Sequence, residues 1–139
     1  MKEELENNTY HVLHIVAHGM LINNDFYLVM ENEEGRHHAV KSLDFSKPIF
    51  PESLGLVVLI SCQSGQTDNG NAIRGLGAHL SNIGIPAVIA MQDVIPIPTA
   101  QLFSQGFYDN LARSGQVDMA MAATRFDLFR RREGKTGDW

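Results

Sequence analysis

The feature that most constrains the fold is a nearly unbroken run of apolar residues, Leu54–Ile60 (LGLVVLI). Both faces of such a strand need cover, so a continuous run is typical of a parallel sheet with helices on each side. Two further runs, Tyr10–Ala17 and Ile85–Met91, are similar in length and rich in strand-forming residues. The sequence therefore predicts three buried strands in a mostly parallel sheet.

Segments with helical periodicity follow the runs Leu54–Ile60 and Ile85–Met91. Their apolar residues recur every three or four positions, which puts them on one stripe of a helix, and a glycine stands after each of the first two stripes. The stripes are Ile73, Leu76, Leu80 and Ile83; Phe103, Phe107 and Leu111; and Val117, Met121, Thr124 and Leu128. Between the first two strands, Phe26–Met30 and Arg36–Val40 predict a hairpin with Gly35 in its turn. Strands that alternate with helices predict one α/β domain over residues 1–139.

Composition argues against several classes of function. A formal net charge of −5 and a pI near 5.6 oppose nucleic-acid binding, because acidic side chains repel phosphate. A single cysteine rules out an internal disulfide framework, which favours a reducing compartment. No stretch approaches the roughly 20 apolar residues of a membrane span, and the polar N-terminus, MKEELENNTY, is unlike a signal peptide. We therefore expect a cytoplasmic protein that binds neither nucleic acid nor membranes.

Two of the predicted strands end on residues that can do chemistry. His18 and Gly19 follow Tyr10–Ala17, and Cys62 follows Leu54–Ile60 after one serine. In parallel sheets, ligands and chemistry lie beyond the carboxyl ends of the strands. We therefore predict that His18 and Cys62 lie at adjacent strand ends and face one crevice.

A cysteine beside a histidine is a candidate nucleophile. The imidazole favours loss of the thiol proton, and the resulting thiolate is the reactive form. The histidine can then return a proton to a leaving amine. The backbone N–H groups of Gly19 and Cys62 would hold the oxyanion of a tetrahedral intermediate. The candidate catalytic residues are therefore His18 and Cys62.

Other interpretations of these residues stay open. Cys62 alone would be a small buried side chain, although the polar QSG that follows it suits a turn better, and His18 would be a structural histidine. His14 and His18 are four positions apart, so in one strand they would share a face and join Cys62 as metal ligands. A fourth ligand is not evident, and we expect no metal. We expect no cofactor either, because Gly70–Gly77 lacks the P-loop lysine and the spacing of a dinucleotide site.

The order of these motifs resembles the caspase-like cysteine peptidases, and within them the CHAT branch. The similar stretches are VLHIVAHG, LVVLISCQSG, GLGAHLSNIGIPAVIAMQ, FYDNLARSGQVDMAMAATR and the closing GDW, from about Tyr10 to Trp139. The resemblance implies a caspase-like three-layer α/β/α sandwich with a mostly parallel sheet. It also implies that His18 matches the family's histidine, Gly19 the glycine after it, and Cys62 the nucleophile.

The chain departs from its relatives around the specificity pocket. Caspases read Gln-Ala-Cys-x-Gly, whereas here one more residue separates Cys62 from the next glycine. Metacaspases have an acidic residue two positions before the cysteine, where this chain has Ile60, so a pocket of that type for arginine or lysine is not expected. After AMQ the chain reads DVIPIPTA, so Asp93 either lines the pocket or faces water. The candidate substrate contacts are Gln63, Gln92 and Asp93.

Relatives have further strands and helices before VLHIVAHG and a strand after GDW. We therefore expect an α/β sandwich that is incomplete at both ends, with exposed edges that favour contact with a missing segment, a regulatory domain or a second copy. The first functional hypothesis is a cysteine endopeptidase domain that acts on a peptide or protein substrate. The second is a catalytically silent protein-interaction or regulatory module. The third is a metal- or small-molecule-sensing α/β domain.

Overall fold

A computed structural model describes residues 7–23, 25–32, 34–41, 44–45, 53–60, 69–91 and 95–133. It has a mixed α/β fold, as the apolar runs and helical stripes predict. The chain divides into two compact units, Met1–Ile95 and Pro96–Trp139. The strands and helix α3 (Asn69–Asn82) belong to the first unit, and helices α4 and α5 belong to the second.

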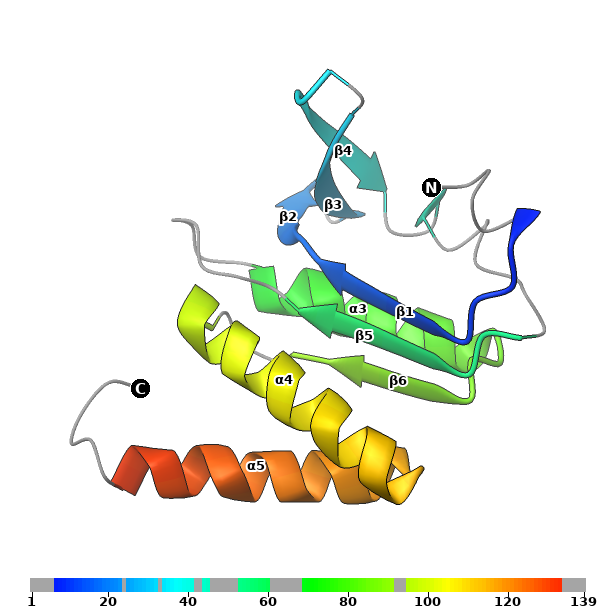
Figure 1. Ribbon diagram of the computed structural model, residues 1–139. Coiled ribbons are helices and arrows are strands. Elements are labelled where there is room, and N and C mark those ends of the chain that lie inside the picture. Colours follow the sequence, from blue (N-terminus) through cyan, green and yellow to red (C-terminus); the bar gives the residue numbers. More distant parts are fainter. Residues whose placement is uncertain are drawn as a thin grey trace. The chain divides into compact units, whose positions relative to one another are not determined.

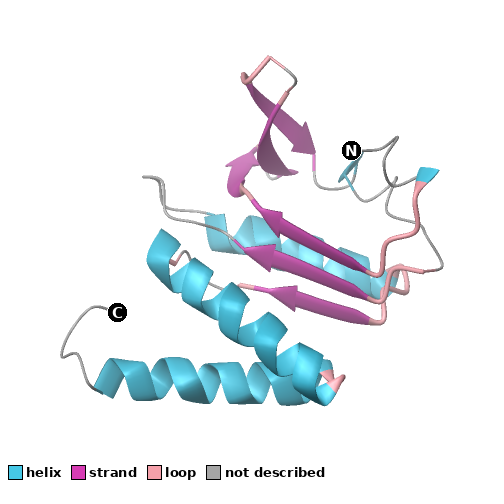
Figure 2. Ribbon diagram, in the orientation of Figure 1, coloured by secondary structure: helices cyan, strands magenta, loops and turns pink. Residues whose placement is uncertain are grey.

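Three parallel strands form the first sheet, as predicted (Figure 1). They are β1 (Val12–Val16), β5 (Leu56–Ile60) and β6 (Ala87–Ala90), and β5 lies in the middle. All five residues of β5 are buried, which agrees with a continuous apolar run. Figure 2 shows the three arrows side by side, with helix α3 running behind them. Each of the three apolar runs therefore contains the strand that it predicts.

Helix α3 packs on one face of this sheet. Leu76 and Leu80 from the predicted stripe are buried in the hydrophobic core together with Val57 of β5. The helix ends shortly before Gly84, whose φ of 101° lies outside the range of a right-handed helix. The structure confirms Leu76 and Leu80 of the predicted stripe and the predicted stop, whereas the side chain of Ile73 lies outside the described residues.

A second, antiparallel sheet lies in the same unit. Its strands are β2 (His18–Ile22), β3 (Asp25–Glu31) and β4 (His37–Lys41), in that order. The hairpin of β3 and β4 confirms a prediction, whereas β2 was not predicted. The first strand ends at Val16, inside the predicted run, and His18 begins a new strand. The short segment HGMLI becomes a strand because β3 supplies its pairing partners, which its own composition does not reveal.

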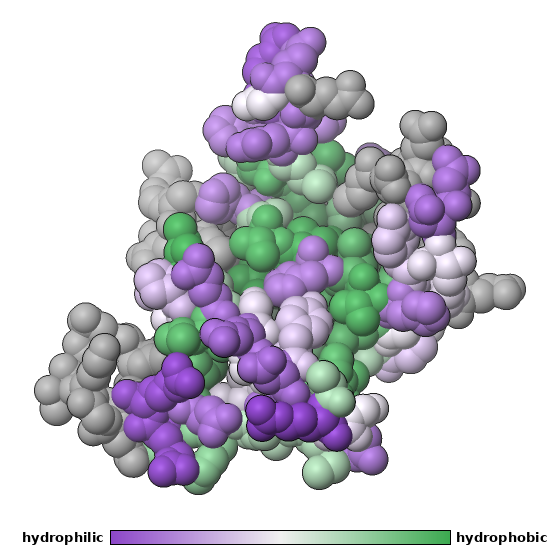
Figure 3. Space-filling model, in the orientation of Figure 1, coloured by the Kyte–Doolittle hydropathy of each residue, from purple (hydrophilic) through white to green (hydrophobic). Residues whose placement is uncertain are grey.

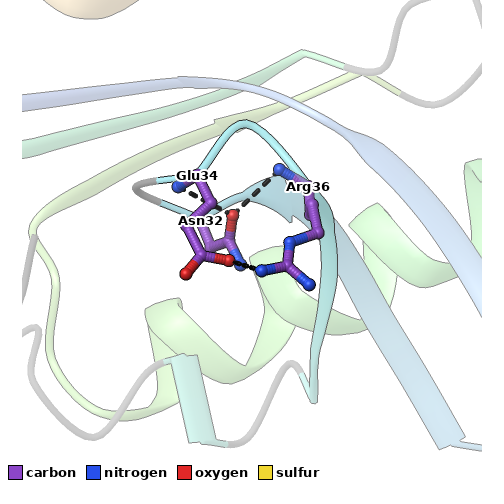
Figure 4. Close-up of polar contacts among 3 residues, drawn as sticks. All are labelled: Asn32, Glu34 and Arg36. Carbon is purple, nitrogen blue, oxygen red and sulfur yellow. Dashed lines mark hydrogen bonds and ion pairs between the residues drawn. The ribbon is translucent and has the colours of Figure 1, made fainter.

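Asn32 organises the turn between β3 and β4 (Figure 4). Its side-chain oxygen accepts hydrogen bonds from the backbone N–H groups of Glu34 (3.1 Å) and Arg36 (2.9 Å). The backbone N–H of Asn32 donates to the Arg36 carbonyl (3.0 Å), and the Arg36 guanidinium pairs with the Glu34 carboxylate. Gly35 has a φ of 72° and lies in this turn, as predicted. Local contacts thus hold β3 and β4 in register.

The second unit is a helical hairpin of α4 (Ile97–Ser114) and α5 (Val117–Glu133). Helix α4 ends before Gly115, as predicted, and the Gly115 N–H donates to the Leu111 carbonyl (2.8 Å). Thr124, a member of the predicted stripe on α5, is fully buried. Within the described segments, every helix is too short or too polar to cross a lipid bilayer.

Candidate functional site

The strands that precede His18 and Cys62 are neighbours in the first sheet. β1 and β5 pair in parallel, with Val16 opposite Ile60. The pairing continues one residue further, since the backbone N–H of Ala17 donates to the Ile60 carbonyl (3.1 Å). His18 directly follows Ala17, and Cys62 comes two residues after Ile60. The chain therefore leaves β1 and β5 at the same end of the sheet, where both strands have their carboxyl ends, just before each candidate residue.

The carboxyl end of β6 also lies at this end of the sheet. The backbone N–H of Met91 donates to the Leu59 carbonyl (3.0 Å), and Gln92 follows Met91 in the chain. Four candidate residues lie outside the described part of the chain: Cys62, Gln63, Gln92 and Asp93. Their contacts with one another and with the histidine stay predictions.

His18 lies on the outer face of the second sheet. It is the first residue of β2 and pairs with Val29 of β3. The next residue of β3, Leu28, is buried in the hydrophobic core, and successive side chains of a strand point to opposite faces. Val29 and its partner His18 therefore point away from that core, and the His18 side chain is half-buried.

The backbone N–H of Gly19 points away from β3. In antiparallel pairs, hydrogen-bonded and non-hydrogen-bonded residue pairs alternate along the strands. The hydrogen bond from Asn32 to Arg36 continues the β3–β4 pairing, so the even-numbered residues of β3 direct their N–H and C=O groups toward β4. Leu28 is one of them, and Gly19 is its partner on β2. The N–H and C=O of Gly19 therefore project from the outer edge of β2.

Two apolar side chains of β2 are exposed on the outer face of the second sheet. Met20 and Ile22 lie on this face with 43% and 39% of their surface exposed. The ammonium of Lys41 lies 2.7 Å from a carboxylate oxygen of Asp25, and this hydrogen bond raises the pKa of Lys41. The two charges neutralise each other. Sequence reasoning missed Met20 and Ile22, because Met20, Leu21 and Ile22 are all apolar and show no alternation that would mark one exposed face of a strand.

His14 does not share a strand with His18. It belongs to β1, where its neighbours Leu13 and Ile15 pack with the core. The His14 side chain therefore faces away from the core. Burial lowers the pKa of His14, because a charged imidazole loses hydration there. The assumption that both histidines lie on one strand is therefore wrong, since the chain passes from one sheet to the other at Ala17. Within the described residues, no group of three or more His, Cys, Asp or Glu side chains is arranged to hold a metal ion.

Comparison with known families gives a match along the whole sequence. The model of the CHAT domain family matches residues 1–139. No curated protein matches the chain, and no solved structure matches it either.

Proposed function

The chain belongs to the CHAT domain family, and from that premise we propose that it is a cysteine endopeptidase domain. The family's resemblance to caspases favours hydrolysis of a peptide bond in a peptide or protein substrate. Cys62 is the nucleophile, His18 is the general acid and base, and the backbone N–H groups of Gly19 and Cys62 form the oxyanion hole. A lone cysteine suits a reducing compartment, so the proposed place of action is the cytoplasm.

The reaction proceeds in two stages. His18 accepts the proton of Cys62, the thiolate sulfur bonds to the scissile carbonyl carbon, and the carbonyl oxygen takes the negative charge. His18 then donates the proton to the leaving amine as the C–N bond breaks, which leaves a thioester. Water, deprotonated by His18, hydrolyses the thioester and restores the thiol. Each stage passes through an oxyanion, for which one N–H donor is worth about 3 kcal/mol.

The hydrogen bond from the Ala17 N–H to the Ile60 carbonyl (3.1 Å) carries this proposal. It joins the residue before His18 to the residue two positions before Cys62. Two residues of chain span at most about 7 Å, so little chain separates either side chain from this bond. Strand β5 is buried along its whole length, and such a strand is a rigid support for a catalytic residue.

The register of β2 supports the role of Gly19. Its N–H is directed away from β3, so the second sheet does not use it, and an oxyanion can accept it. We assign the substrate contacts to Gln63, Gln92 and Asp93. Support for this assignment is that β6 ends at the same end of the sheet as β1 and β5, two residues before Gln92.

Labelling with a thiol-reactive peptide probe tests the dyad. We expect the probe to label Cys62 in the unmodified chain, to leave Cys62→Ala unlabelled, and to label His18→Ala about 100-fold more slowly. His14→Gln is the matched control, because it removes a histidine of β1 that has no role in the proposed reaction. Equal labelling of His18→Ala and the unmodified chain would overturn the dyad and favour the catalytically silent interaction module.

A further inference from the structure

Strand β2 is an edge strand that begins at the proposed catalytic histidine. Within the described residues it pairs with β3 and with no other strand. Because hydrogen-bonded pairs alternate along β2 and β3, the N–H and C=O groups of Gly19 and Leu21 are both directed away from β3. An outward row of donors and acceptors is a template for the addition of another strand.

The side chains beside this edge suit an apolar partner. A strand added to β2 places every second side chain on the outer face, next to Met20 and Ile22. These two residues are about two-fifths exposed, at 43% and 39%. The nearby charges of Asp25 and Lys41 are paired with each other, so they do not call for a charged partner.

We infer that the edge of β2 is the substrate-binding edge of the peptidase. An extended peptide pairs with the backbone of Gly19 and Leu21, and it packs alternate apolar side chains against Met20 and Ile22. The inference rests on the proposed function, because the Gly19 N–H that holds the oxyanion is the first donor of this row. The substrate class is therefore an extended segment with apolar residues at alternate positions. A helical segment does not fit, since its backbone groups are already bonded internally.

A proline at Leu21 tests the backbone pairing. Leu21→Pro removes an N–H that β3 does not use, and edge strands tolerate proline where the N–H faces outward. Leu21→Ala is the matched variant, because it removes the same side chain and keeps the N–H. We expect the peptide probe to label Cys62 about tenfold more slowly in Leu21→Pro than in Leu21→Ala. Equal labelling by the peptide probe would overturn the inference.

A charge at Met20 tests the side-chain contacts, also in the case that Leu21→Pro does not fold. With a peptide library, we expect the unmodified chain to prefer apolar residues at alternate positions. Met20→Asp should shift the preference at one position toward lysine or arginine by about tenfold. Ala39→Asp is the control, because Ala39 is exposed on the same face but lies on β4, two strands away. An unchanged preference in Met20→Asp would overturn the inference.

Alkylation by iodoacetamide separates this inference from the proposed function. The reagent has no peptide backbone, so it reports the reactivity of the thiol alone, and we expect equal rates in Leu21→Pro and Leu21→Ala. If His18 activates Cys62 but the Leu21 and Met20 variants change nothing, the substrate binds elsewhere and the peptidase proposal stands. If His18→Ala and the unmodified chain are alkylated equally fast, the peptidase proposal fails and the inference fails with it.

Discussion

Burial lowers the pKa of His14, a residue of β1. A histidine in an unfolded chain titrates near 6.5, so the unfolded state binds more protons than the folded state as the pH falls below about that value. We therefore expect the free energy of unfolding to decrease as the pH is lowered through about 6.5 toward the folded-state pKa. Urea unfolding at a series of pH values measures this decrease. His14→Gln should show a shallower pH dependence, and identical slopes for the two proteins would contradict the expectation.

The thiol of Cys62 gives a second prediction at the residue scale. If His18 stabilises the thiolate, the alkylation rate should reach half its maximum below about pH 8.5, the value of a free cysteine. His18→Ala should move this midpoint upward and slow alkylation at neutral pH. Iodoacetamide kinetics between neutral and alkaline pH provide the measurement. A midpoint that is the same in both proteins would show that His18 does not act on the thiol.

Two glycines show how packing between elements limits substitution. A Cβ at Gly77 of α3 would lie 3.0 Å from the Cβ of Ala90, whereas a Cβ at Gly106 of α4 would lie 3.4 Å from Cγ2 of Thr124. Glycine to alanine inside a helix gains about 1 kcal/mol of helix propensity. We expect Gly106→Ala to raise the free energy of unfolding by up to about that amount. Gly77→Ala should lower it, because the Ala90 Cβ is attached directly to the strand backbone and cannot turn aside.

Urea unfolding of the two alanine variants compares these effects directly. The gain in helix propensity is common to both, so the difference between the variants reports the space beside each helix. A stabilising effect of similar size at both positions would show that α3 and β6 can move apart without cost.

The surface of the whole molecule gives a prediction about association. Hydrophobic side chains gather over β1 on the face shown in Figure 3, and Val12 and Val16 are 39% and 59% exposed. β1 is also an edge strand of the first sheet among the described strands. Apolar side chains at a strand edge favour contact with another chain. We therefore expect the chain to self-associate.

Sedimentation velocity over a range of concentrations measures the association. Val16→Lys should shift the equilibrium toward the monomer, because a charge at that edge opposes strand addition. Ala39→Asp, which changes an exposed residue of β4 in the other sheet, should leave the association unchanged. A chain that is monomeric at all concentrations would contradict this prediction.

Local burial patterns were sufficient to predict most of the elements. Leu54–Ile60 is apolar throughout because β5 is covered on both sides, and Leu76 and Leu80 recur at helical spacing because one side of α3 meets the core. Such patterns depend on which faces of one element are covered, so their periodicity can be read from neighbouring positions in the sequence. The family stretches were enough to recognise the CHAT domain, whereas the catalytic roles of His18 and Cys62 stay predictions.

The role of the segment after β1 was decided by tertiary structure. Nothing local in HGMLI indicates that it pairs with β3, and the faces of its residues follow from the register of that pairing. A shift of one residue would turn His18 into the core and direct the Gly19 N–H at β3. The register is set by the partner strand β3 and by the short connection after Ile22, which lie next to HGMLI but outside it. The side of the sheet that His18 faces is therefore a property of the folded molecule.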